Sequence, residues 1–258
     1  MRSLDELHDL VEAYLQRLSF AGELEGLTES MRYALEGGGK RIRPVLCLAT
    51  GEAAGGEAEE LLPAAAAIEL VHTFSLVHDD LPALDDDALR RGRASTHVAH
   101  GEAVAILAGD ALLAQAVDLA LAYSRPEVAR ELIQATLGMI GGQYLDVADG
   151  NVELTRLHSL KTGKLFSAAV GSALWVAGVA EAEQQPWRQF ARDFGLLFQI
   201  VDDLLDGDGL VAEHGEKRTR ELAGETEESV RARLAVIDAD TSRLGELVSG
   251  LSTRAQAS

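Results

Sequence analysis

The sequence predicts an all-α protein that folds as one large helical bundle. Alanine and leucine, both strong helix formers, dominate the 258 residues, whereas aromatic residues make up 5% and prolines number five. Apolar residues recur every three or four positions, as in Leu4–Leu18, and no segment keeps the period of two that marks a strand. No linker rich in proline, glycine or serine divides the chain, so we expect a single domain over residues 1–258.

Periodicity and helix breakers place the expected elements in order along the chain. Charge is absent between Leu70 and Val77, which predicts an interior helix and an apolar centre for the bundle. Breaks are expected at Gly37–Gly39, Gly55-Gly56, Pro82, Pro126, Gly150 and Pro186. The predicted helices span residues 3–19, 28–36, 42–55, 58–81, 98–123, 126–149, 153–180, 184–208 and 221–249.

Charge and cysteine content exclude several classes of partner. Lysine and arginine number 23 against 42 acids, a net charge of −19, which excludes nucleic acid and polybasic docking on anionic membranes. A single cysteine, Cys47, suits a reducing cytosol. Met1–Leu18 lacks the apolar core of a secretory signal, and the uncharged stretch Leu165–Ala180 is shorter than a membrane span. We therefore expect a cytoplasmic protein without a membrane span.

The first candidate site is an acidic run, Asp79-Asp80-Leu-Pro-Ala-Leu-Asp85-Asp86-Asp87, that ends an otherwise apolar helix. These carboxylates repel one another and meet the negative end of the helix dipole. A divalent cation such as Mg²⁺, which prefers oxygen ligands, would relieve both effects. On a straight helix Asp79 and Asp85 point apart, but Pro82 interrupts the helix and lets them converge. The alternative is a solvated acidic loop.

A second acidic cluster, Asp202-Asp203-Leu-Leu-Asp206, follows the apolar run Phe194–Val201. Asp202 and Asp206 are four residues apart and share a helix face, where like charges destabilise the helix unless something compensates. Two such clusters, each ending an apolar helix, favour cation binding over the alternative of two solvated faces.

Basic residues gather at three places in this acidic chain. Gly37–Pro44 reads GGGKRIRP, Arg90-Arg91 follows the first acidic run, and Lys161–Lys164 reads KTGK. Such cations bind phosphate oxygens, and the alternative for each is a solvated surface patch. His72 lies seven residues before Asp79 on nearly the same helix face. It is either a ligand at the site or a core residue whose ring is hydrogen-bonded within the protein. Acids for Mg²⁺, cations for phosphate and an apolar interior together predict a hydrophobic substrate that carries a diphosphate.

The motifs GGGKRIRP, HTFSLVHDDLPALDDDALRRG, KTGKLF and FQIVDDLLD resemble those of the short-chain trans-polyprenyl diphosphate synthases, the farnesyl and geranylgeranyl diphosphate synthase family. The resemblance runs in the family's order from about residue 30 to 208. It implies the all-α isoprenoid synthase bundle, usually a homodimer. It also implies a transferase that condenses isopentenyl diphosphate with C5 and C10 allylic diphosphates.

The resemblance also implies roles for individual residues. Mg²⁺ ions, three of them once substrate is bound, are held by Asp79, Asp80, Asp85, Asp202, Asp203 and Asp206. Isopentenyl diphosphate is bound by Lys40, Arg43, His72 and Arg91. Positions around the allylic substrate are Arg90 and the catalytic residues Lys161, Thr162 and Gln199. The positive charges let the allylic C–O bond ionise, the double bond of isopentenyl diphosphate attacks, and a proton is lost to the released diphosphate.

Product length depends on the floor of the pocket, where the family places the residues five and four before the first aspartate. These are Phe74 and Ser75, and a phenylalanine there resembles the farnesyl-type bacterial enzymes, so we expect a C15 product. The alternatives are a geranylgeranyl or geranyl diphosphate synthase, a terpene cyclase, or a non-catalytic subunit of a heteromeric synthase. After Asp206 the chain departs from the family pattern, and Lys217 falls one residue from an expected lysine that touches the allylic diphosphate.

Overall fold

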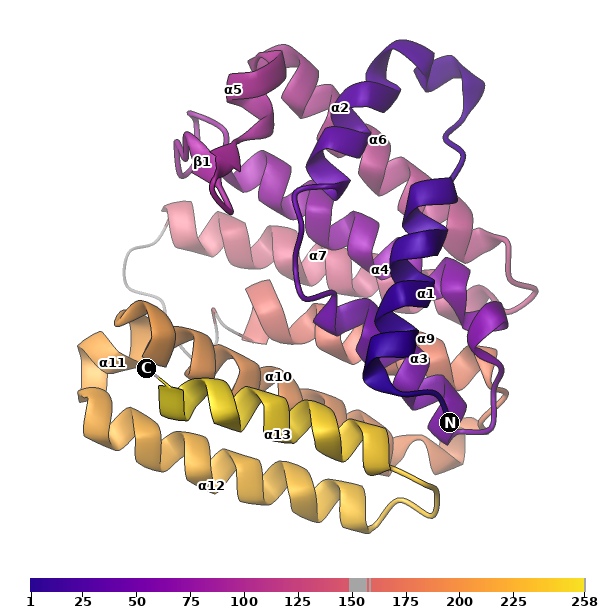
Figure 1. The fold of residues 1–258 in the computed structure, drawn as a ribbon, viewed down its shortest axis with the longest axis vertical. Coiled ribbons are helices and arrows are strands. Elements are labelled where there is room, and N and C mark those ends of the chain that lie inside the picture. The colour runs from indigo at the N-terminus through magenta and orange to yellow at the C-terminus, as the bar shows by residue number, and fades with distance from the viewer. Residues whose placement is uncertain (149–156, 158, 258) are drawn as a thin grey trace.

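The protein is a bundle of helices, which confirms the predicted fold class. The computed structural model describes residues 1–148, 157 and 159–257. Within those residues, the β-structure is limited to a hairpin of two short strands, β1 (Leu89–Arg90) and β2 (Arg93–Ala94). Figure 1 shows the helices stacked in layers, with the N- and C-termini on opposite sides of the view.

Helix α4 (Ala58–Asp79) lies at the centre because almost its whole circumference is apolar. It packs against α3 (Ile42–Ala53), α6 (Glu102–Leu121) and α9 (Lys164–Val176). One charged residue, Glu69, is buried in the middle of α4, and its partners are described with the site below. The interior helix predicted from the uncharged stretch is therefore confirmed.

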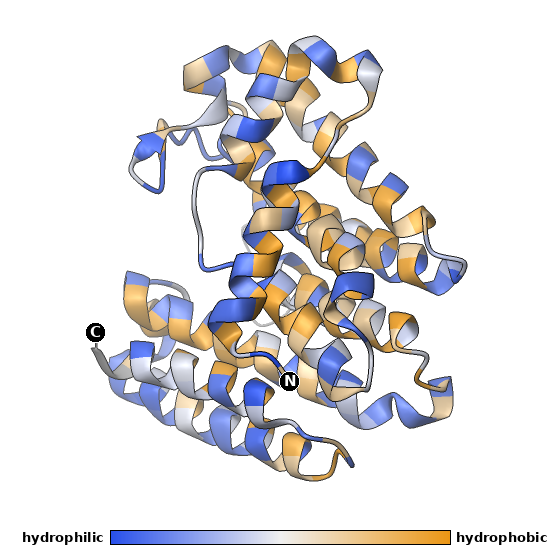
Figure 2. Cartoon of the chain, turned by 45° about the vertical axis from the view of Figure 1, so that its right-hand side comes forward, coloured by the Kyte–Doolittle hydropathy of each residue, from blue (hydrophilic) through white to orange (hydrophobic). Residues whose placement is uncertain are grey.

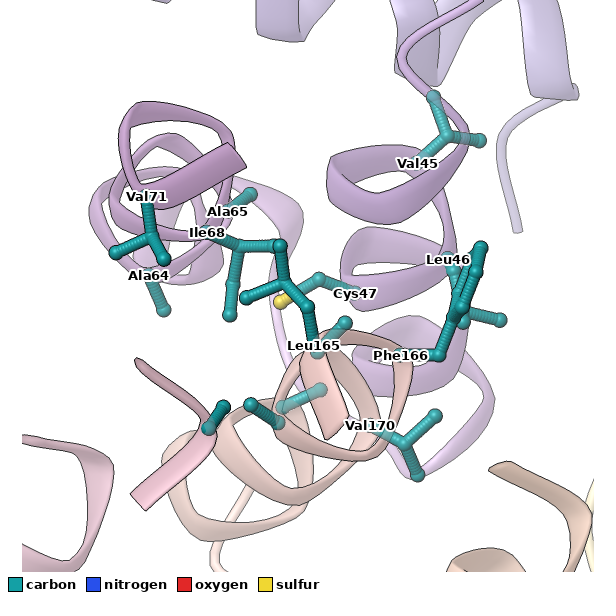
Figure 3. Close-up of a cluster of buried hydrophobic side chains, with 14 of the residues drawn as sticks. Val45, Leu46, Cys47, Ala64, Ala65, Ile68, Val71, Leu165, Phe166 and Val170 are labelled. Atoms are coloured by element: carbon teal, nitrogen blue, oxygen red, sulfur yellow. The ribbon is translucent and has the colours of Figure 1, made fainter. Parts of the chain in front are cut away.

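Close-packed apolar side chains join α3, α4 and α9 (Figure 3). Ile68 of α4, Cys47 of α3 and Phe166 of α9 are all fully buried there. Burying an apolar side chain of this size stabilises a fold by roughly 1.5–3 kcal/mol. Burial also raises the pKa of the Cys47 thiol to about 12, so the thiol stays protonated at neutral pH.

The remaining long helices surround this centre. Helices α12 (Glu216–Ala235) and α13 (Ser242–Ala257) lie side by side and pack on α10 (Gln185–Asp206). Figure 2 shows that α12 and α13 carry mostly hydrophilic residues, in contrast to the apolar interior. This outer layer therefore covers α10 with one face and meets solvent with the other. Other elements of the bundle are α1 (Leu4–Arg17), η1 (Gly22–Leu27), α2 (Thr28–Leu35), α7 (Pro126–Ala148) and η3 (Glu181–Glu183).

Two predicted helices are in fact each divided. Residues 98–123 were predicted as one helix, but Gly101 adopts a φ of 89° and separates α5 (Thr96–His100) from α6. Residues 221–249 divide into α12 and α13, and the Asp240 carboxylate accepts a hydrogen bond from the Ser242 backbone at the start of α13. A short helix, α11 (Gly209–His214), and the β-hairpin were not predicted.

The predicted helix at 153–180 is only partly described. Residues 153–156 and 158 lie outside the described part of the chain. A π-helical turn, η2 (Ser159–Gly163), leads into α9, which ends at Val176, and Gly178 beyond it adopts a φ of 78°. The predicted end at residue 180 was therefore four residues too late.

In the described part of the chain, two helices are long and apolar enough to cross a membrane by length and composition alone. They are α4 and α6, and 72% of the apolar window of α4 is buried inside the bundle against 39% for α6. The expected absence of a membrane span rested on Leu165–Ala180 alone, and it stays a prediction.

Candidate active site

Two cavities lie on either side of the last turns of α4. The first, about 430 Å³ and here named the basic cavity, is lined by Lys40, Arg43, His72, Arg90, Arg91 and Asp202, among others. The second, about 360 Å³ and named the apolar cavity, is lined by Phe74, Ser75, Leu84, Met139, Ile140 and Val147, among others. The structure thus brings all five predicted substrate-binding residues to one cavity and both predicted chain-length residues to the other.

A tightly held loop forms the entrance of the basic cavity. Gly38 and Gly39 adopt φ values of 76° and 143°, and Arg41 is left-handed at 45°. A Cβ on Gly39 would lie 2.6 Å from Nη1 of Arg91, so only glycine lets that guanidinium approach the loop. The positive φ values at Gly38 and Gly39 favour glycine for the turn, and Gly39 also leaves room for the Arg91 guanidinium.

Arg41 fixes this loop from inside the protein. Its Nε donates to Glu12, its Nη1 to Glu69 and its Nη2 to the carbonyl of Leu35, each at 2.6 Å. A buried cation needs this degree of pairing to offset its lost hydration. Neither Arg41 nor Glu69 was among the predicted site residues. The signal was present, since Glu69 is the one acid in an otherwise apolar helical stretch.

Arg43 and His72 form the floor of the basic cavity. The Arg43 guanidinium lies 4.6 Å from the ring centre of Phe166 and 5.5 Å from that of Phe198, and burial lowers its pKa to about 10. Burial, together with Arg43 and Arg91, holds the pKa of His72 well below its usual range, so the imidazole is neutral. Its Nε2 lies 3.4 Å from Nη1 of Arg43. Nε of Arg43 is buried and has no hydrogen-bond partner within the described residues.

The first acidic run turns back on itself after α4, as its proline suggested. The backbone N–H of Asp85 donates to the carbonyl of Asp79 at 2.9 Å, which places the two residues side by side. Burial raises the pKa of Asp79 to about 6, and the charges of Asp85 and Asp80 act in the same direction against Lys161 and Arg90. The desolvated carboxylate of Asp79 therefore favours a nearby cation.

Asp80 differs from its neighbour Asp79. It is 3% exposed, and its carboxylate accepts hydrogen bonds from Nε, at 2.9 Å, and Nη2 of Arg90. Arg90 is presented by the β-hairpin, whose two turn residues, Arg91 and Gly92, both have positive φ, as the tight two-residue turn requires. Asp80 thus holds the hairpin, and with it Arg90 and Arg91, against the end of α4.

The second acidic cluster likewise contains one aspartate that is hydrogen-bonded within the protein and one that faces a cavity. Asp203 is 2% exposed, and it accepts hydrogen bonds from the backbone of Leu210 at 2.9 Å and from Gln199 at 2.8 Å. Asp202 lines the basic cavity, and burial with the charge of Asp206 raises its pKa. The predicted catalytic residue Gln199 therefore supports Asp203 and is not part of the described lining of either cavity.

A π-helical turn presents the two other predicted catalytic residues. Lys161 lines the apolar cavity beside Asp79, and its ammonium lies 2.5 Å from the carboxylate of Asp146. A Cβ on Gly142 of α7 would lie 2.8 Å from Cγ of Lys161, so a glycine is needed where α7 and η2 meet. Single π-turns inside helices are frequent at functional sites. Thr162 lies on the same turn, outside the described lining of both cavities.

Gln143 is a site residue that the sequence argument missed. It lines the apolar cavity from α7, and both polar atoms of its side chain are buried without a hydrogen-bond partner in the described residues. Buried polar atoms normally find a partner, so this amide is available to a bound molecule. A glutamine in a helix gives no such signal in sequence alone.

Comparison with known proteins decides between the interpretations of these motifs. The model of the family described as polyprenyl synthetase matches residues 25–223. The chain belongs to the polyprenyl synthetase family. Family membership makes it a transferase, and more closely a prenyltransferase, as the motifs implied.

Relatives of this family member are similar over most of its length. A geranylgeranyl diphosphate synthase from Cyanophora paradoxa is 43% identical over 79% of this chain and 73% of its own. A dimethylallyltranstransferase from Fischerella ambigua is 42% identical over 79% of this chain, which spans 63% of that protein. The crystal structure of a geranyltransferase from Legionella pneumophila superposes with a TM-score of 0.88, at 32% identity over 98% of this chain and 96% of that one.

Proposed function

We propose that this prenyltransferase condenses isopentenyl diphosphate with C5 and C10 allylic diphosphates and makes farnesyl diphosphate. The observation that carries the proposal is the pair of cavities flanking the end of α4, one basic and one apolar, with carboxylates beside each. Isopentenyl diphosphate fits the basic cavity, where Nε of Arg43 has no hydrogen-bond partner among the described residues. The growing isoprenoid chain fits the apolar cavity, which Asp79 and Lys161 border.

Magnesium is the cofactor that the donor set fits. Asp79, Asp85, Asp202 and Asp206 offer hard oxygen ligands, and none of their carboxylates has a hydrogen bond or an ion pair in the part of the chain that is described. No group of three metal-ligating side chains is assembled among the described residues. Mg²⁺ itself takes one or two carboxylates and completes its shell with phosphate oxygens and water. When bound, it supplies positive charge that stabilises the departing diphosphate.

The chain's own residues then position and protect the reactants. The allylic C–O bond breaks and its electron pair leaves with diphosphate, the double bond of isopentenyl diphosphate forms the new C–C bond, and a proton passes to the released diphosphate. Lys40, Arg43 and Arg91 hold the attacking substrate. Phe74 and Met139 keep water from the carbocation. No protein nucleophile is required.

Product length rests on the floor of the apolar cavity. Phe74 is almost fully buried there, with its ring edge-on to His78 at 5.0 Å between centroids. A bulky floor supports a C15 product. A geranylgeranyl product is the second candidate, because relatives such as the Cyanophora enzyme carry that name.

The test is a condensation assay of the purified chain with Mg²⁺, isopentenyl diphosphate and dimethylallyl diphosphate, followed by product chromatography. We expect C15 from the wild type, longer products from Phe74→Ala and the wild-type product from the matched control Phe74→Tyr. A C20 product from the wild type would favour the second candidate, and unchanged length in Phe74→Ala would exclude Phe74 as the floor. Cyclic hydrocarbon from farnesyl diphosphate alone, or no activity, would contradict the proposal.

We also propose that the chain acts as a homodimer in the cytoplasm. Several large apolar side chains of α6 and α7 are exposed, and three of them, Ile140, Tyr144 and Val147, form the outer wall of the apolar cavity at 49%, 68% and 63% exposure. A second copy would cover this wall. Light scattering of Leu137→Glu, from the same face, should give a monomer, while Val236→Glu on an exposed loop should remain a dimer.

A further inference from the structure

One residue that lines the basic cavity lies outside all the motifs that resemble the family. Arg254, four residues from the end of the chain, lines it together with Lys40 and Asp202. It belongs to the last turn of α13, beyond the region in which the motifs resemble the family. In Figure 1 this end of α13, marked C, lies beside the C-terminal end of α10, which carries the second acidic cluster.

The last turns of α13 are fixed in this position. Leu244, Val248 and Leu251 are buried on the face that packs on α10 and α12. Arg220 of α12 donates a hydrogen bond to the carbonyl of Ala255, next to Arg254, and is itself paired with Glu216 at 2.8 Å. The backbone that carries Arg254 is therefore held by neighbouring helices.

Arg254 differs from the other arginines of this outer layer. Arginines elsewhere on α12 and α13 each lie within 4 Å of a carboxylate: Arg218, Arg220, Arg231, Arg233 and Arg243. Arg254 has no hydrogen bond or ion pair of that kind among the described residues, although acids outnumber cations in the chain by 42 to 23. It faces the basic cavity instead.

The groups around Arg254 include both signs of charge. The charge of Arg254 adds to burial in lowering the pKa of Lys40, and it opposes the burial that raises the pKa of Asp202. Lys40, Arg43, Arg90 and Arg91 outnumber Glu69 and Asp202 on the cavity wall. Cations gathered in this way repel one another until an anion joins them, and a guanidinium binds phosphate oxygens bidentately.

We propose that Arg254 is a diphosphate ligand in the basic cavity, supplied to isopentenyl diphosphate by the C-terminal helix. The assignment of that substrate to this cavity rests on the proposed function. The segment after Asp206, where the family resemblance ends, forms α11 and α12, and Lys217 there is exposed and outside the described lining of the cavity. The basic cavity instead receives an additional cation, Arg254, from the end of α13.

The experiment compares Arg254→Gln with Arg254→Lys and with a matched control, Arg243→Gln, which removes the same charge from the other end of α13. Calorimetry measures the binding of inorganic diphosphate in the presence of a chelator, so that the acidic clusters take no part. Steady-state kinetics then give KM for each substrate. Thermal melts confirm that all three variants are folded.

For Arg254→Gln we expect diphosphate affinity to fall, and KM for isopentenyl diphosphate to rise, by about 10- to 100-fold. This is the effect expected from losing one hydrogen bond to a charged group. KM for the allylic substrate should change less than about twofold, because Arg254 is proposed to contact only isopentenyl diphosphate. Arg254→Lys should recover part of the lost affinity, because it keeps the positive charge. Equal behaviour of Arg254→Gln and Arg243→Gln would overturn the proposal. A rise in the allylic KM alone would also overturn it. If the wild type makes no product, the proposed function fails, and calorimetry still decides the role of Arg254.

Discussion

The two charged regions of the active site are built in opposite ways. In the basic region Arg41 is paired with Glu12 and Glu69, and Arg90 is paired with Asp80. In the acidic region, the carboxylates of Asp79 and Asp202 have no such partner among the described residues, and burial raises the pKa of both. Acids of the protein thus hold Arg41 and Arg90 of the first region in place, whereas Asp79 and Asp202 in the second are left without a cation partner among the described residues.

On the proposed function, this difference would let one active site distinguish two anionic substrates. A prearranged basic cavity binds a diphosphate directly, because its donors are already held in place. An acidic region repels the same group until cations reverse its sign. We therefore expect isopentenyl diphosphate to bind without metal and the allylic substrate to need metal.

Removing a carboxylate from the acidic region should have the largest effect. We expect Asp79→Asn and Asp202→Asn each to lower kcat by about 10²- to 10³-fold, since each removes a preorganised group that stabilises developing charge. Steady-state assays at saturating Mg²⁺ measure this. The matched control is Asp86→Asn in the same run, whose positive φ of 53° an asparagine tolerates. A loss for Asp86→Asn as large as for Asp79→Asn would mean that net charge alone matters.

Removing a carboxylate from the basic region should damage the fold instead. Glu69→Gln leaves Arg41 with one acid in a buried site, and breaking a buried ion pair costs about 3–5 kcal/mol. Urea denaturation should show this loss, with Glu12→Gln less affected because that carboxylate is more exposed. Wild-type stability in Glu69→Gln would show that the basic region is not held by this pair.

The unpaired state of the acidic region should be visible in stability without metal. The pKa of Asp79 is raised from its ordinary 3.8 to about 6, so between these pH values the folded state holds a proton that the unfolded state has lost. Stability therefore falls as pH rises through this window. With a chelator present, we expect Asp79→Asn to match the wild type near pH 4 and to be about 3 kcal/mol more stable above pH 7. A constant difference between the two across this range would contradict the raised pKa.

The smallest effect is expected outside both regions. Lys217 lies exposed on α12, so Lys217→Gln should change either KM by less than about twofold. A selective rise in the allylic KM would instead place this lysine in the acidic region, in line with the family pattern.

The sequence predicted which kinds of residue form the site better than it predicted the separate role of each residue. Aspartates that end apolar helices stand out because no fold gains stability from them. Within each pair, however, sequence cannot separate Asp79 from Asp80, or Asp202 from Asp203. The difference is set by Arg90 in a hairpin and by the backbone of Leu210, and both contacts depend on tertiary structure.

For the fold, the sequence predicted the central helix but missed where two of the predicted helices divide. The central helix α4 is evident from its composition, since a helix that is apolar on all sides must be buried. The divisions of two predicted helices were missed for different reasons. Gly101 was visible as a breaker but lies among good helix formers, whereas residues 236–241 contain no glycine or proline. Arg254 could not be assigned to the cavity from sequence, because α13 reaches it only through packing on α10 and α12.

The burial of Cys47 makes the protein convenient for labelling. This thiol is the sole one in the chain, is fully buried, and stays protonated far above neutral pH, so it will not react with maleimides in the folded protein. A cysteine introduced at Ala88 in the hairpin region or at Thr253 on α13, both exposed, would be the single reactive thiol. Spectroscopic probes at these two positions would report movement of the hairpin region relative to α13 during turnover, with no need to prepare a cysteine-free background.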